Sequence, residues 1–133
     1  RLTVLIDSNV VIDLATDSPW ADWAAERLDE LSGEAFAINQ LIYTEVCFAY
    51  ASGRELDGLI DRLGIERANL PWEAAFTAAR AFRMYRESDG VKTSPLPDFY
   101  IGAHAAFAGF KLLTRDARRY RTYFPEVELV APD

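Results

Sequence analysis

The sequence has very little cysteine or histidine and no long apolar run. A single cysteine, Cys47, cannot form an internal disulfide, and the single histidine, His104, cannot supply the clustered ligands of a zinc site. No segment reaches the roughly 20 apolar residues that span a bilayer, and the start is too short before its first acid to be a signal peptide. We therefore expect a cytoplasmic protein, in a reducing environment and without a membrane anchor.

Basic residues are also in the minority. The chain of 133 residues has 14 Lys and Arg against 21 Asp and Glu, which gives a net charge of -7. This balance argues against a protein that holds nucleic acid through a broad basic face. Half of the residues are hydrophobic, and no repeat or low-complexity run is present. The length suits one domain over residues 1–133 with a buried core.

Short apolar runs alternate with helical patterns along the chain. Strands are predicted at residues 2–6, 35–38, 65–70, 111–114 and 127–131. Helices are predicted at residues 10–15, 19–32, 40–51, 54–63, 71–87 and 98–108, with a helical turn or two at 115–120. Apolar strands without a polar face are typical of a parallel sheet covered on both sides. We predict a three-layer α/β/α sandwich with a central, mainly parallel sheet.

Two acids come directly after predicted strands or close behind them. Asp7 follows the strand at 2–6, and Asp116 follows the strand at 111–114. The carboxyl ends of parallel strands meet at one edge of the sheet, where loops form sites. Each acid could also be an ordinary helix cap, because Asp is favoured at that position.

Two further acids fall inside apolar helices. Glu45 is the only charge in its helix, and Asp98 begins a helix that is apolar on most sides. Burying a carboxylate without a cation or hydrogen-bond donors costs several kcal/mol, so we expect a positively charged group beside each of these acids. A buried ion pair with an arginine is the alternative for Glu45, and the helix dipole or a capping role for Asp98.

Four carboxylates at one place repel one another unless cations lie between them. Oxygen ligands without Cys or His favour a hard divalent ion such as Mg²⁺ or Mn²⁺. Such an ion suits phosphodiester hydrolysis, because it polarises a phosphoryl oxygen and activates water. Ser8, Asn9 and Thr114 could hold metal-bound waters, or could simply form turns and caps. We expect Asp13 on an outward turn and His104 in the core or at its edge.

The four acids lie in the segments VLIDSNVVIDL, YTEV, PLPDFYIGAHA and LLTRDARRY. Together these segments resemble the four acidic motifs of PIN-domain ribonucleases, and the size and order of elements resemble VapC-type toxins of type II toxin-antitoxin pairs. The resemblance implies a PIN-like fold and a Mg²⁺- or Mn²⁺-dependent endoribonuclease. It also implies that Asp7, Glu45, Asp98 and Asp116 are catalytic metal ligands, with Asn9 and Thr114 as supporting polar residues.

The resemblance further implies partners. Members of this branch usually form homodimers and are inhibited by a cognate VapB-type antitoxin. In this chain the arginines on either side of Asp116 could steer the RNA backbone, or could be a solvated face. These are Arg115, Arg118 and Arg119. Tyr120 or Tyr123 could stack on an unpaired base, although core packing is the alternative for at least one of them.

Two other functions remain open on the residues alone. A phosphohydrolase with an aspartate nucleophile would use Asp7, but the second Asp of that pattern is replaced here by Asn9. A catalytically inactive PIN-like module would bind RNA or protein only, and it would gain nothing from four clustered carboxylates. Covalent catalysis through Ser or Cys is disfavoured because no motif surrounds His104.

Overall fold

The sheet has five parallel strands in the order β3-β2-β1-β4-β5. A computed structural model describes residues 2–50, 52–88, 90–92 and 96–132. The strands are β1 (Thr3–Ile6), β2 (Ala35–Ile38), β3 (Ile65–Arg67), β4 (Lys111–Leu113) and β5 (Leu129–Val130). Val4, Leu5 and Ile6 of the central strand are completely buried, as expected for a strand covered on both faces. The predicted parallel sheet is confirmed.

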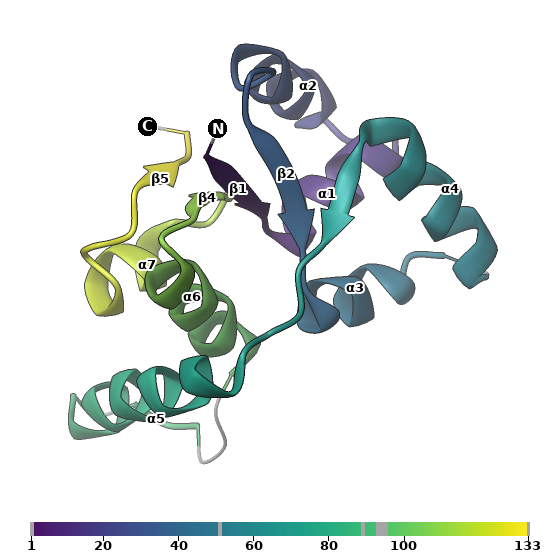
Figure 1. The fold of residues 1–133 in the computed structure, drawn as a ribbon. Helices are drawn as coiled ribbons and strands as arrows, with labels where there is room; N and C mark the ends of the chain where they lie inside the picture. Colours follow the sequence, from purple (N-terminus) through teal and green to yellow (C-terminus); the bar gives the residue numbers. More distant parts are fainter. Residues whose placement is uncertain (1, 51, 89, 93–95, 133) are drawn as a thin grey trace.

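Helices cover both faces of this sheet. They are α1 (Ser8–Ala15), α2 (Ala21–Glu30), α3 (Gln40–Cys47), α4 (Gly53–Leu63), α5 (Trp72–Glu87), α6 (Pro97–Ala108) and α7 (Arg118–Tyr123). Parallel crossovers are right-handed, so the connections that lead from β1 to β3 and those that lead from β3 to β5 fall on opposite faces. Accordingly α1 lies on one side of the sheet, and α6, with α5 and α7 packed on it, lies on the other (Figure 1).

Helix ends follow the capping chemistry of the sequence at several places. The Asn39 side chain accepts a hydrogen bond from the Ile42 amide at 3.0 Å and so begins α3. Gly64 and Gly109 end α4 and α6 in the left-handed region, with φ of 68° and 71°. These residues fix where α3 and α6 begin or end, and therefore where Glu45 and Asp98 lie.

Other boundaries differ from the prediction. α2 begins at Ala21 rather than at residue 19, because the Ser18 hydroxyl accepts from the Trp20 amide and donates to Asp13. α3 ends at Cys47, short of the predicted end at residue 51, which itself lies outside the described residues. β3 ends at Arg67, because only the first three residues of the strand predicted at 65–70 pair with β2.

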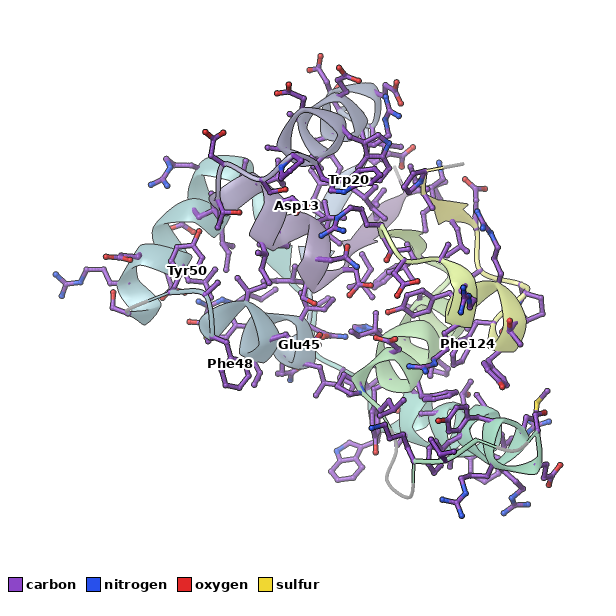
Figure 2. All side chains as sticks on the ribbon, turned by 180° about the vertical axis from the view of Figure 1, so that it is seen from behind. Asp13, Trp20, Glu45, Phe48, Tyr50 and Phe124 are labelled. Atoms are coloured by element: carbon purple, nitrogen blue, oxygen red, sulfur yellow. The ribbon has the colours of Figure 1, made fainter. Side chains whose placement is uncertain are left out.

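A close approach between α6 and the end of α7 determines the position of α7. A Cβ at Gly102 of α6 would lie 2.4 Å from the Phe124 ring, so the absent side chain leaves room for that ring. Figure 2 shows Phe124 at the end of α7, directed toward the interior. Phe124 and Tyr120 are both 1% exposed. Their burial holds α7 close to the first turn of α6.

The single histidine is a buried structural residue, as predicted. His104 on α6 is 2% exposed, and its Nδ1 lies 3.0 Å from the Asn39 Nδ2. Because the Asn39 amide is a donor there, Nδ1 accepts the bond and the ring is neutral. His104 therefore connects α6 to the cap of α3. No helix within the described ranges is long and apolar enough to cross a membrane.

Acidification should weaken this connection. Burial lowers the pKa of His104 from its usual 6.5, so the unfolded chain binds a proton more readily than the folded one. The free energy of unfolding should then fall as the pH drops below about 6.5, by up to about 1.4 kcal/mol at pH 5.5. Chemical unfolding at pH 7.5 and 5.5 measures this loss. His104→Gln should lose less over the same range, and an equal loss in both proteins would contradict the assignment.

Candidate metal and nuclease site

The carboxyl ends of β1 and β4 place two functional residues side by side. Ile6 pairs with Leu113, and the Asp7 amide donates to the Leu113 carbonyl at 2.9 Å. Asp7 and Thr114 therefore leave neighbouring strands at the same edge of the sheet. Crossovers leave β1 toward one side and reach β4 on the other, which is the place where open α/β sheets form their sites.

Asp7 is buried and surrounded by donors. Its side chain is the N-cap of α1, with Oδ1 accepting from the Ser8 amide at 2.8 Å. Its Oδ2 accepts from the Thr114 hydroxyl at 2.9 Å and from the Tyr120 hydroxyl at 3.0 Å. The capping role and the site role predicted for Asp7 are thus compatible, because each uses a different carboxylate oxygen.

Tyr120 joins two of the acids. Its buried hydroxyl lies 3.0 Å from Asp7 Oδ2 and 3.4 Å from Asp98 Oδ1. A phenol has one proton, so it can donate to only one of these oxygens at a time. Sequence reasoning did not assign this role to Tyr120. The spacing of one helical turn after Asp116 was the signal that could have found it.

Asp98 also has a cationic partner. Arg119 Nη1 lies 3.2 Å from Asp98 Oδ2, and both side chains are about one-third exposed, at 34% and 35%. The Arg119 guanidinium also lies over the rings of Tyr85 and Phe99, 5.5 and 5.6 Å from their centroids. Asp98 therefore stands in the first turn of α6 with more than the helix dipole to stabilise it.

Glu45 approaches the same place from α3. Its Oε1 accepts a hydrogen bond from the Ser8 hydroxyl at 3.1 Å, which links α3 to the start of α1. No ion pair between Glu45 and an arginine is present among the described residues, so the alternative of a buried ion pair is not supported. Figure 2 shows Glu45 facing the middle of the molecule, whereas Phe48 on the same helix points outward.

The acids repel one another. Burial is the main cause that raises the pKa of Asp7, and the charge of Asp98 raises it further. Burial likewise raises the pKa of Glu45, with contributions from Asp7 and Asp98. Burial also raises the pKa of Asp98, against the opposing effect of Arg119, and Asp116 raises it further. The charges of Asp7, Asp98 and Asp116 thus each raise the pKa of at least one neighbouring acid.

A pocket of about 510 Å³ opens beside these acids. Its lining residues are Tyr85, Asp98, Asp116, Arg118, Arg119, Thr122 and Tyr123. Asp116 is exposed, and its backbone amide donates to the Thr114 hydroxyl at 3.1 Å. Thr114 thus orders both Asp7 and the loop that carries Asp116.

The residues fit a hard divalent cation. Within the described part of the chain, no three His, Cys, Asp or Glu side chains stand close enough to hold a metal ion as a group. Mg²⁺, however, usually binds through one or two carboxylates and keeps several waters. Asp7 and Asp98 face a common hydroxyl, and the charge of Asp98 makes the ionisation of Asp7 more costly, which a cation between them would relieve. The donors are oxygens only, which suits Mg²⁺ or Mn²⁺.

Asn9 and Arg115 secure the loop after β4. The Arg115 amide donates to Asn9 Oδ1 at 3.1 Å, and Asn9 Nδ2 lies 3.4 Å from the Thr114 hydroxyl. The Arg115 side chain points elsewhere. It forms a bidentate ion pair with Asp13, with Nη2 3.2 Å from Oδ1, and its guanidinium lies over the Trp20 ring.

The prediction for Asp13 was wrong. Asp13 is 2% exposed rather than on an outward turn, because Arg115 and the Ser18 hydroxyl supply the donors that let it be buried. Figure 2 shows Asp13 and Trp20 near each other, away from Glu45. Arg115 is therefore already paired, whereas Arg118 and Arg119 line the pocket. The partner of Asp13 is distant in sequence, so no local pattern revealed it.

Comparisons with known proteins agree with this geometry. VapBC2 from Rickettsia felis, bound to a DNA fragment from its promoter, superposes with a TM-score of 0.78 at 14% identity over 99% of this chain and 100% of that chain. DNA-bound VapBC from Salmonella typhimurium gives 0.72 at 18% identity, with 98% of each chain covered. A toxin-antitoxin complex from Klebsiella pneumoniae gives 0.64 at 23% identity, again with 98% of each chain covered.

At these identities the likeness to solved structures establishes the fold. A search of curated protein sequences finds no significant match. The family model of the PIN domain matches residues 4–125, which include all four acids and nearly the whole chain. The chain therefore belongs to the PIN domain family.

Proposed function

We propose that the chain is a Mg²⁺- or Mn²⁺-dependent endoribonuclease that acts as the toxin of a toxin-antitoxin pair. One observation carries the proposal: four acids from two strand ends and two helices gather at the edge of a parallel sheet, where the charges of Asp7, Asp98 and Asp116 raise the pKa of neighbouring acids. Clustering like charges costs stability, and a purely structural site would not need it. Membership of the PIN domain family supports a hydrolase of nucleic acid.

The chain's own residues have separate roles in this proposal. Asp7, Glu45, Asp98 and Asp116 would hold the ion, which when bound polarises a phosphoryl oxygen and lowers the pKa of the attacking water. Thr114 and Tyr120 orient Asp7 by hydrogen bonds to its Oδ2. Arg118 and Arg119, on the pocket wall, would attract the phosphate backbone toward the acids.

The phosphohydrolase alternative loses support in the structure. That reaction would need a general acid two residues after Asp7, where this chain has Asn9. Both ends of the Asn9 amide are engaged, one by the Arg115 amide and the other by Thr114. Asn9 therefore acts as a brace for the loop after β4.

Incubation with total RNA tests the proposal. We expect cleavage by the wild type with Mg²⁺ or Mn²⁺, and none after chelation. Asp98→Asn should lower the rate about 100-fold or more, since it removes a carboxylate from the ion. Glu55, which lies on α4 outside the site, gives the matched control: Glu55→Gln should cleave like the wild type. Cleavage that survives chelation would contradict the metal mechanism, and absence of any cleavage would favour the inactive binding module.

Two protein partners complete the proposal: a VapB-type antitoxin and a second copy of the chain. The similar structures are VapBC or toxin-antitoxin complexes, which supports the first. On α5, Trp72 and Phe76 lie one turn apart and are 91% and 71% exposed, and such apolar surface often marks an interface.

Light scattering tests the second partner. The wild type should have twice the chain mass of 15.0 kDa. Replacing Trp72 and Phe76 together by glutamine should reduce it to one chain, because the apolar contact that drives association is removed. A single-chain mass for the wild type would exclude the homodimer, and a dimer in the double variant would place the interface elsewhere.

A further inference from the structure

The pocket beside the acids combines two kinds of wall. Asp98 and Asp116 lie on it, and so do two arginines and two tyrosines, Tyr85 and Tyr123. Its volume of about 510 Å³ falls within the range of pockets that hold small ligands. A ligand that contacts both walls needs two groups. An anionic group would bind the arginines or a metal ion held by the acids, and a flat apolar group would pack on the tyrosine rings.

The aromatic wall is firmly supported. The rings of Tyr85 and Tyr123 meet edge to face, with centroids 6.2 Å apart. Each also packs on the buried Phe99, at centroid distances of 5.5 and 5.4 Å. Phe99 is completely buried in α6, one residue after Asp98. The two tyrosines are therefore fixed relative to the acids, as a stacking surface should be.

The two arginines of the pocket differ in their engagement. Arg119 is held by Asp98 and by the Tyr85 ring, so its flat guanidinium has a fixed place in the wall. Arg118 is exposed at the start of α7, and its side chain has no ion pair among the described residues. Arg119 can thus extend the flat surface, while Arg118 has its charge available for a phosphate.

We propose that this pocket binds one unpaired nucleotide of the substrate RNA, beside the bond that is cut. The inference rests on the proposed nuclease function and specifies which side chains of this chain contact that nucleotide. The base lies against Tyr123 and Arg119, and Arg118 contacts a phosphate. A base inside a duplex has both faces covered by its neighbours, so only an unpaired base can use this wall.

Binding of mononucleotides tests the proposal without any cleavage. Adenosine 5'-monophosphate and ribose 5-phosphate share the phosphate and the sugar, and differ only in the base. In the presence of Mg²⁺, calorimetry should show that the nucleotide binds about 5- to 100-fold more tightly, the contribution typical of one stacked base. NMR chemical shifts of the Thr122 and Tyr123 amides report whether binding occurs at this pocket.

Variants separate the two contacts. Tyr123→Leu should remove most of the difference in affinity between the nucleotide and ribose 5-phosphate, whereas Tyr123→Phe, which retains the ring and the packing on Phe99, should bind like the wild type. Arg118→Gln should weaken both ligands. Arg121 lies on the same helix but does not line the pocket, so Arg121→Gln is the matched control and should change neither.

The outcomes distinguish this inference from the nuclease proposal. Equal affinity for the two ligands, or shifts confined to other parts of the chain, would overturn the nucleotide pocket. Base-dependent binding at Thr122 and Tyr123 supports it, even in a protein that leaves RNA uncut. RNA cleavage together with equal affinities would retain the nuclease proposal and reject the pocket.

Discussion

Replacing Arg115 by methionine is expected to lower the free energy of unfolding by about 3 to 5 kcal/mol. The reason is the partner left behind. The Asp13 side chain is 3% exposed, whereas that of Arg115 is 32% exposed. Without the guanidinium, Asp13 would keep only the Ser18 hydroxyl as a donor in an otherwise water-excluded place. A buried carboxylate without its cation loses far more than an exposed ion pair would contribute.

Urea unfolding of three variants measures this effect. Arg118→Met removes a nearby exposed arginine and should change the stability by less than about 0.5 kcal/mol. Adding Asp13→Asn to Arg115→Met should recover part of the loss, because the uncompensated charge is gone. A loss of less than about 1 kcal/mol for Arg115→Met would show that the pair with Asp13 contributes little to the fold.

Asparagine at Asp7 should have two opposite effects: RNA cleavage should fall about 100- to 1000-fold, and the melting temperature should rise by about 3 °C. Cleavage falls because a central carboxylate is lost. Stability rises because burial and Asp98 raise the pKa of Asp7, so its ionised form disfavours folding at neutral pH. A gain of about 1 kcal/mol corresponds to that shift for a domain of this size.

The pH dependence gives the sign of this gain. Because the folded-state pKa lies above the usual 3.8, the cost of ionised Asp7 appears as the pH rises from 3.8 and is complete above the folded-state value. The difference in stability between Asp7→Asn and the wild type should therefore grow with pH. The oxygen of Asn can still cap α1, and the Thr114 and Tyr120 hydroxyls can rotate to accept hydrogen bonds from its amide nitrogen. Asp17→Asn, at an exposed loop position, should alter neither property. A less stable Asp7→Asn protein would contradict the account.

The sequence allowed most of the fold to be predicted, because its signals are local. Apolar runs marked all five strands, and the predicted helix ends at residues 40, 63 and 108 adjoin Asn39, Gly64 and Gly109, whose cap chemistry needs no tertiary contact. Boundaries failed where distant groups intervene. The helix predicted from residue 19 begins only at Ala21, where the hydroxyl of the preceding Ser18 is shared between Trp20 and the buried Asp13.

The site could be predicted in part for a similar reason. A carboxylate in an apolar setting is conspicuous in a sequence, which is how Glu45 and Asp98 were found. Tyr120 was a candidate for base stacking or for core packing, and only the position of its hydroxyl between Asp7 and Asp98 shows its role in the site. Asp13 looked like a solvated helix residue, because its compensating cation is 102 residues away. Long-range polar pairs leave no periodic signal.

The pairing of β1 with β4 also determines when the acid cluster can assemble during synthesis of the chain. Thr114 reaches Asp7 across 107 residues of chain, and Tyr120 across 113. During synthesis β4 and α7 emerge from the ribosome long after Asp7. A nascent chain therefore lacks the assembled acid cluster until both β4 and α7 have been synthesised.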